Sequence, residues 1–230
     1  MNLLAIDTSS LACSVALQAG DALTERHEEQ AREHTRLLTP MIRDVLGDRN
    51  LDATQLDAIV LGNGPGSFIG MRIAASLAQG LAHGAGISIV PVSSLAAVAA
   101  QVLDETDADE VVVAQDAHMQ EVYLGAFRRG ADQLPQPVFG ERLQAQSRID
   151  DLDDMAAPRR VAAGYGWERY PGLLAVNEGL FGEQSKVLHP RARFLLPLGA
   201  AALASGGAIR PQELVPAYLR SKVASAPAAS

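Results

Sequence analysis

The sequence predicts an α/β protein of two lobes, each built on a mixed β-sheet with helices, and three observations lead to this fold class. The chain opens with antiparallel hairpin strands and then alternates helices with strands, a succession that produces a mixed sheet. A polar, acidic segment at 104–110 separates two halves of similar plan. The second half begins with another hairpin, over 111–127, that echoes the first. We therefore expect lobes at 1–103 and 104–223, followed by a disordered tail at 224–230.

Short-range patterns place the first elements of the chain. Apolar or alternating residues predict strands at 3–7, 13–17 and 22–27. Gly20-Asp21 forms the hairpin turn between the second and third of these strands. A first helix is expected from 29 to 46, because its apolar residues recur at spacings of three and four. Pro40 lies inside this pattern and is expected to kink or restart the helix.

A glycine-rich stretch at 62–72 organises the rest of the first half. It follows a buried strand at 58–61 and precedes a helix expected over 73–83, with Ser67 as its N-cap. Bare amides at a helix N-terminus favour an anion, so Gly64, Gly66 and Ser67 are candidates for a phosphate-binding loop. The stretch lacks the lysine of a P-loop and the spacing of a dinucleotide-binding loop. A simple tight turn from strand to helix therefore stays an equal alternative.

The remaining elements alternate in the same way. A strand at 88–92 leads to an alanine-rich helix that ends near Leu103 and is capped by Ser93 or Ser94. In the second half we expect a hairpin of strands at 111–115 and 121–127, a loop at 134–137, a short acidic helix at 149–155, a strand at 161–164 and a helix at 192–205.

Composition and charge restrict the function. The 230 residues carry a net charge of −8, and the sequence contains no lysine-rich patch. Autonomous, tight binding to nucleic acid is unexpected, because neutralisation of phosphates supplies most of that affinity. A single cysteine, Cys13, excludes an internal disulfide bond. The chain opens with a strand in place of a targeting segment, and no apolar run is long enough to span a membrane, so we expect a cytoplasmic protein without membrane contact.

Isolated polar residues offer few catalytic or metal-binding groups. Asp7, at the carboxyl end of the first strand, either forms an Asx turn or orients a metal or water beside a phosphate. His34 stands alone on its helix, because the residue four positions later is Leu38, so we expect no metal site and no cofactor. A peptidase is disfavoured as well: the chain lacks a His-Glu-x-x-His segment and a Gly-x-Ser-x-Gly elbow, and Cys13 lies inside an apolar strand.

Several motifs occur in the same order as in the bacterial TsaB family, also called YeaZ, which the chain resembles from residue 3 to about 222. The matching segments are Leu4-Ala5-Ile6-Asp7-Thr8-Ser9, Glu33-His34-Thr35, Gly64-Pro65-Gly66-Ser67-Phe68 through Arg72, Asp116-Ala117 with Glu121-Val122-Tyr123, and Pro216-Ala217-Tyr218-Leu219-Arg220. In their order these segments are specific, although no single one is.

The resemblance implies a fold and a pathway. The implied fold is actin-like and belongs to the ASKHA class, which also includes Hsp70 and sugar kinases. Each of its two lobes is RNase H-like. The pathway forms N6-threonylcarbamoyladenosine at position 37 of tRNAs that read codons beginning with A. In it the paralogue TsaD transfers the threonylcarbamoyl group, and the ATPase TsaE joins the complex. TsaB is implied to be a non-catalytic partner subunit that meets tRNA only through the complex.

The same resemblance implies a partner interface on the first two long helices. Related subunits pair there, both as a homodimer of the isolated chain and as a mixed dimer with TsaD, so the two pairings exclude each other. An apolar stripe beside small residues permits close approach of helices. The residues expected in this interface are Leu37, Leu38, Met41, Met71, Ala74, Ala75 and Ala78.

One rival function uses the cleft of an actin-like fold for nucleotide phosphohydrolysis or phosphotransfer. Asp7 and Asp116 would face a metal, and the loop at 64–67 would face phosphate. The absence of glycine between Asp7 and Gly20 disfavours close approach of that turn to a phosphate. The chain also departs from the TsaB pattern at Ile69, Ala74 and Gln120, where the family usually has threonine, glycine and glycine.

Overall fold

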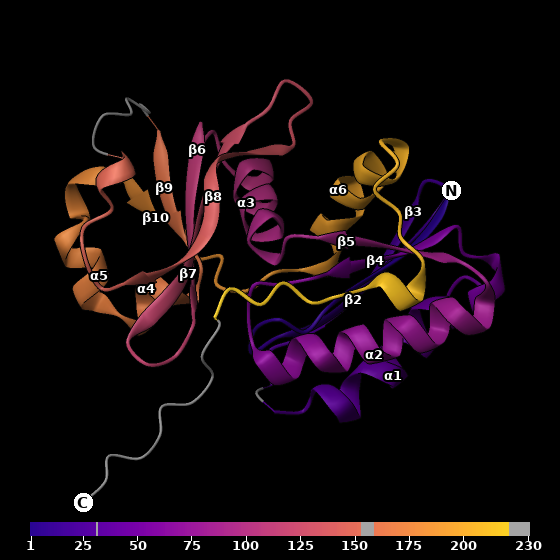
Figure 1. Cartoon of the computed structure of the whole chain (residues 1–230). Helices are drawn as coiled ribbons and strands as arrows, with labels where there is room; N and C mark the ends of the chain where they lie inside the picture. Colours follow the sequence, from indigo (N-terminus) through magenta and orange to yellow (C-terminus); the bar gives the residue numbers. More distant parts are fainter. Residues whose placement is uncertain (31, 153–158, 221–230) are drawn as a thin grey trace, which may run out of the picture.

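The computed structural model describes residues 1–30, 32–152 and 159–220, and these form two five-stranded sheets with helices on both faces (Figure 1). The first sheet has the order β3-β2-β1-β4-β5. Its strands are β1 (Asn2–Asp7), β2 (Cys13–Ala19), β3 (Ala22–Glu28), β4 (Ala58–Gly62) and β5 (Ser88–Val92). Strands β1, β2 and β3 pair antiparallel, whereas β4 and β5 continue the sheet in parallel, which confirms the predicted mixed sheet.

The second sheet repeats this topology strand for strand. Its order is β10-β9-β6-β7-β8, with β6, β7 and β8 antiparallel and β9 and β10 added in parallel. The strands are β6 (Glu110–Asp116), β7 (Glu121–Arg129), β8 (Pro135–Ala145), β9 (Arg160–Ala163) and β10 (Glu183–Gln184). The duplication expected from the two hairpins is therefore present, and β1 corresponds to β6.

The helices cover both faces of each sheet. They are α1 (His34–Gly47), α2 (Phe68–Ala85), α3 (Ser94–Glu105), α4 (Tyr165–Arg169), α5 (Pro171–Val176) and α6 (Ala192–Ala204). Single 3-10 turns lie at Ala53–Gln55, Asp150–Leu152, Glu178–Leu180 and Pro211–Glu213. Helices α1 and α2 pack on one face of the first sheet, and α4 and α5 pack on the outer face of the second.

The last helix of each half packs on the sheet of the other half. Helix α3 follows β5 of the first sheet but buries Leu95, Val98 and Val102 against β6, β7 and β9. Helix α6 follows β10 of the second sheet but packs Leu195 and Leu196 against β1 and β4. The two helices contact each other between the sheets (Figure 1). The boundary at 103/104 thus separates the sheets, while the division into domains stays a prediction.

Three local expectations need correction. Helix α1 begins at His34 and not at Glu29, because Arg32 takes a left-handed φ of 66° that interrupts a helix. From His34 to Gly47 the helix is unbroken across Pro40. The predicted loop at 134–137 is mostly strand: β8 starts at Pro135, and its prolines are tolerated because β8 is an edge strand. Of the acidic helix, only the 3-10 turn at Asp150–Leu152 is seen among described residues. The tail at 224–230 lies outside them.

Candidate functional site

The turn after β1 packs directly on the glycine-rich loop between β4 and α2. The amide of Ser67 donates a hydrogen bond to the carbonyl of Ser9 at 2.6 Å, and the hydroxyl of Thr8 donates to the carbonyl of Gly70 at 2.7 Å. A Cβ atom on Gly66 would lie 2.2 Å from the carbonyl oxygen of Ser9, and one on Gly70 would lie 1.9 Å from that of Thr8. These glycines are needed because the chain's own backbone approaches them so closely.

The carboxylate of Asp7 is fully buried at the centre of this contact. Its Oδ1 accepts hydrogen bonds from the amide and the hydroxyl of Ser9, both at 2.8 Å, so Asp7 forms the Asx turn. Its Oδ2 accepts from the hydroxyl of Ser94 at 2.6 Å. Burial raises the pKa of Asp7 to about 6, although the hydrogen bonds from Ser94 and Ser9 and the nearby His34 lower it. Both carboxylate oxygens are therefore bound by donors of this chain.

The predicted phosphate loop is also held by internal hydrogen bonds. The amide of Gly64 donates to the Ser94 hydroxyl at 3.1 Å, and the Ser67 hydroxyl caps α2 by accepting from the amide of Gly70 at 3.2 Å. The structure thus brings Asp7, Gly64, Gly66 and Ser67 together. Their interactions tie β1, α2 and the start of α3 to one another, and a phosphate role for the loop stays a prediction.

The second half repeats this aspartate turn. The Oδ1 atom of Asp116, at the end of β6, accepts hydrogen bonds from the amide of His118 and from the hydroxyl of Tyr170, both at 2.7 Å. The loop after β9 again requires a glycine: a Cβ atom on Gly164 would lie 2.3 Å from the carbonyl oxygen of Ala114 in β6. The turn from 118 to 120 takes positive φ at three residues in succession, including Gln120 at 64°, where the family pattern has glycine.

A hollow of about 180 Å³ lies between the lobes. It is lined by Gly66, Ser67, Phe68, Met71, Asp116, Ala117, His118, Met119, Tyr123, Tyr218 and Arg220. Asp7 is absent from this lining, because the turn at 7–9 lies behind the glycine loop. The two aspartates required by the rival phosphotransfer function therefore do not both face the hollow, and this arrangement disfavours that function.

The C-terminal segment at 215–220 closes the hollow by contacting both lobes. Tyr218 lies 5.5 Å from the ring of Phe68, and its hydroxyl accepts a hydrogen bond from Nε of Arg72 at 3.0 Å. Arg220 reaches the second lobe instead, where it donates to the carboxylate of Glu121 at 2.6 Å and to the carbonyl of Ala117 at 3.0 Å. This segment therefore connects the two lobes, with Tyr218 on the first lobe and Arg220 on the second.

Metal-binding and nucleophilic groups are scarce in the described ranges. Across residues 1–30, 32–152 and 159–220, no group of three or more His, Cys, Asp and Glu side chains has the arrangement of a metal site. His34 is buried, and its Nε2 lies 2.9 Å from the carbonyl oxygen of Ser10. Burial raises the pKa of Cys13 to about 12, so this thiol is a poor nucleophile at neutral pH.

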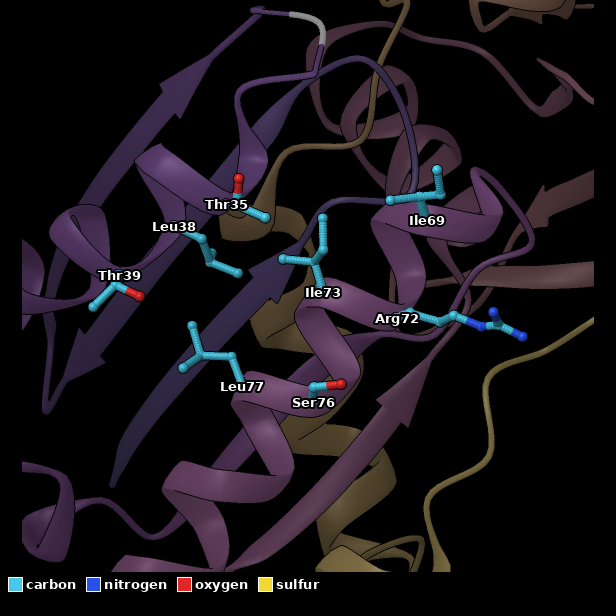
Figure 2. Close-up of a pocket in the computed structure, with 8 residues that line it drawn as sticks. All are labelled: Thr35, Leu38, Thr39, Ile69, Arg72, Ile73, Ser76 and Leu77. Carbon is cyan, nitrogen blue, oxygen red and sulfur yellow. The ribbon is translucent and has the colours of Figure 1, made fainter.

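Helices α1 and α2 form a shallow apolar groove of about 550 Å³ on the surface of the first lobe (Figure 2). Its lining residues are Thr35, Leu38, Thr39, Ile69, Arg72, Ile73, Ser76 and Leu77. Ile69, at the start of α2, is 70% exposed, whereas Leu38 forms the floor and is buried. An exposed apolar surface of this kind is typical of a protein-protein contact.

Most residues that the sequence assigned to the partner interface lie in the core of this chain. Leu38, Met41, Ala74, Ala75 and Ala78 pack on the first sheet, Met71 is buried beside Gly64, and Leu37 is half-buried. Helices α1 and α2 turn their apolar residues toward the first sheet. The apolar stripe that was assigned to a partner interface is therefore the face that packs in the core of this chain. The apolar residues of α2 that line the groove, Ile69, Ile73 and Leu77, were not among those predicted, and the position of a partner interface stays a prediction.

The two lobes repeat one strand order, and each has an aspartate turn after its first strand. These features define an actin-like α/β protein of the ASKHA class. The family model described as "TsaD: tRNA N6-adenosine threonylcarbamoyltransferase" matches residues 24–172. The curated "tRNA threonylcarbamoyladenosine biosynthesis protein TsaB" of Escherichia coli (strain K12) is 34% identical over 97% of this chain and 96% of its own length. This chain belongs to the TsaB family.

Further relatives agree with this assignment. The TsaB protein of Haemophilus influenzae is 35% identical over 97% of this chain and 95% of its own length. A solved structure described as "YeaZ from Pseudomonas aeruginosa" superposes with a TM-score of 0.87 at 33% identity, covering 95% of this chain and 99% of that one. Among the described residues, none of the helices has the length and apolar character needed to cross a membrane.

The close approach at Gly70 predicts a large difference between two glycines of α2. Gly70→Ala should lower the free energy of unfolding by about 2–3 kcal/mol, because its Cβ would overlap the carbonyl oxygen of Thr8. Gly80→Ala is the matched control on the same helix; nothing lies within 4 Å of its Cβ, and it should stabilise by roughly 0.5–1 kcal/mol. Urea denaturation measures both, and equal effects would contradict the packing described here.

The buried carboxylate of Asp7 predicts a pH-dependent stability. Its folded pKa of about 6 lies above the ordinary value of 3.8, so this group stabilises the fold below pH 4 and loses that contribution as pH rises through 6. The stability of Asp7→Asn relative to the unchanged chain should therefore improve by about 2 kcal/mol between pH 4 and pH 7. Urea denaturation across this range, with exposed Asp21→Asn as control, tests the slope, and a slope of opposite sign would refute it.

Proposed function

We propose that this chain is a non-catalytic, activating subunit of the cytoplasmic complex that forms N6-threonylcarbamoyladenosine at position 37 of tRNAs that read codons beginning with A. It binds the catalytic paralogue TsaD through the groove between α1 and α2, and the ATPase TsaE joins the pair. The names of the curated TsaB relatives and the match to the TsaD family model support this pathway.

The observation that carries the proposal is the contrast between the occupied aspartate turns and the exposed groove. Asp7 is fully buried with both oxygens hydrogen-bonded to serines, and Asp116 accepts from its own turn and from Tyr170. Catalysis of group transfer needs charged groups directed at a substrate. In this chain those carboxylates hold loops in place, whereas an apolar surface on α1 and α2 is available to another protein.

The charge of the chain fits a subunit that meets tRNA indirectly. The net charge of −8 opposes the approach of a polyanion, and phosphate contacts require clustered lysine and arginine. In the proposed complex, the catalytic partner supplies the tRNA-binding surface. This chain contributes affinity for that partner and the conformation that the partner needs for activity.

Reconstitution tests the proposal. Purified TsaD, TsaE and the synthase that makes threonylcarbamoyl-adenylate are incubated with tRNA, threonine, bicarbonate and ATP, with and without this chain, and modified adenosine is quantified. The proposal predicts modification only when this chain is added, and none by this chain alone. Equal modification without it, or modification by the chain alone, would overturn the proposal.

Ile69 provides a variant that separates binding from folding. Its side chain is 70% exposed, so Ile69→Glu should leave the stability of the isolated chain within about 0.5 kcal/mol of the original. The same change places a charge in the apolar groove and should weaken binding of TsaD at least about tenfold. Val176→Glu, at a 48% exposed apolar residue of α5, is the control. Equal TsaD affinity of the two variants would place the interface elsewhere.

A further inference from the structure

The chain after α6 follows the first lobe for most of its length and leads into the C-terminal segment at 215–220. Ile209 pairs with β5 through two backbone hydrogen bonds, of 2.8 and 3.0 Å. The side-chain amide of Gln79 in α2 donates to the carbonyl of Pro211 at 2.9 Å. The backbone amide of residue 217 then donates to the carbonyl of Asn63 at 3.0 Å. Figure 1 shows this part of the chain, in yellow, continuing from the first lobe toward the second sheet.

Arg220 carries the segment into the second lobe. Its Nη2 atom donates to the carboxylate of Glu121 at 2.6 Å. The same atom donates to the carbonyls of Ala117 and His118 at 3.0 and 3.4 Å. Its Nη1 atom lies 3.5 Å from the sulfur of Met119. The side chain of Arg220 is 15% exposed, so it is embedded in the turn between β6 and β7.

The two walls of the inter-lobe hollow are joined through this segment. Within the described part of the chain, no hydrogen bond or ion pair connects the glycine loop at 62–72 directly with the turn at 116–121. Tyr218 contacts the first wall, where its hydroxyl accepts from Arg72, and Arg220 contacts the second. The polar connection between these two walls therefore runs along the C-terminal segment.

The turn that Arg220 holds has a conformation that its residues rarely adopt. His118, Met119 and Gln120 take φ values of 60°, 53° and 64°, and none of them is glycine. Successive left-handed residues persist where surrounding contacts compensate their strain. Arg220 supplies such contacts through the carbonyls of the turn, and the side chain of Gln146 contacts Gln120 from the second lobe. Loss of Arg220 should therefore let the turn relax.

The two ends of this connection differ in strength. The first lobe holds the chain through backbone pairing with β5, through Asn63 and through the ring of Tyr218. Among the described residues, the hydrogen bonds from the segment at 215–220 to the second lobe all come from Arg220. Glu121 is 30% exposed, and ion pairs that water reaches are weak. Movement of one side chain would thus detach the segment, while α3 and α6 keep the lobes assembled.

We propose that the C-terminal segment is a latch on the hollow between the lobes. Arg220 bound in the turn keeps the hollow closed, and release of Arg220 opens the hollow and relaxes the turn at 118–120. The latch does not depend on the proposed function, because every contact that it uses lies within this chain.

Hydrogen exchange tests the hold on the turn. The amide of Ala117 donates to the carbonyl of Glu121, and the amide of Glu121 donates to that of His118, so both amides report the conformation of the turn. Arg220→Gln should accelerate exchange in a peptide covering 116–121 by about tenfold or more, because hydrogen bonds to a charged group are lost. A peptide from α1 should exchange at the original rate.

Arg210→Gln is the matched control. Arg210 pairs with Glu213 at 2.6 Å, the distance of the Arg220 pair, and the two changes alter the net charge equally. Both members of the control pair lie in the 3-10 turn region that packs on the first lobe, so this variant should leave exchange at 116–121 unchanged. Equal acceleration in the two variants, or none in either, would overturn the latch.

A distance measurement tests the opening itself. Spin labels on Leu23→Cys in β3 and Val176→Cys in α5 lie on exposed residues of different lobes, whereas Cys13 is buried. Electron-electron resonance should show a broader and longer distance distribution after Arg220→Gln and the original distribution after Arg210→Gln. Faster exchange at 116–121 with an unchanged distance distribution would mean that Arg220 supports the turn alone, and it would refute the latch.

A second variant keeps the test decisive if Arg220→Gln impairs folding. Glu121→Gln removes the carboxylate and leaves Arg220 its two carbonyl acceptors in the turn. This variant should open the hollow to a smaller extent, with exchange and distance changing together. A folded Glu121→Gln chain that matches the original in both measurements would contradict the latch.

Discussion

The contact between the Asp7 turn and the glycine loop determines how the first lobe is assembled. The end of β1, the loop before α2 and the start of α3 meet there through the buried carboxylate of Asp7 and the hydroxyl of Ser94. Glycines at 66 and 70 permit this approach because any Cβ would overlap a carbonyl oxygen of the turn. Helix α2 begins directly at this contact, so the position of the outward groove on α1 and α2 depends on it.

The duplication of the fold explains how the lobes stay together. Each half donates its last helix to the sheet of the other, which buries apolar surface that neither half could bury alone. The C-terminal segment adds polar contacts from Tyr218 to the first lobe and from Arg220 to the second. The inter-lobe hollow is consequently bounded by elements with structural roles, which agrees with the proposal that another protein binds at the groove and not at the hollow.

The sequence predicted those features that depend on neighbours along the chain. Strands β1 to β7, the Ser67 and Ser93 caps and the repeated hairpin follow from local alternation, glycine and capping residues. The sequence could not show that α3 packs on the second sheet and α6 on the first. The apolar pattern of each helix would be the same if it packed on the sheet of its own half. Ala78 was assigned to the interface because apolar periodicity is the same for a core face and a partner face. The glycine loop was ambiguous for a similar reason: close packing and phosphate binding both favour glycine.

The central claim is that the cleft residues of this chain hold the fold together and that its exposed groove performs its function. Calorimetric titration of the isolated chain with ATP in the presence of magnesium tests this claim most directly, with the ATPase TsaE as the positive control. The account predicts no saturable binding up to millimolar nucleotide, because Asp7 and the amides of Gly64 and Ser67 are already hydrogen-bonded. Stoichiometric binding with a dissociation constant of about 10 μM or lower would contradict it.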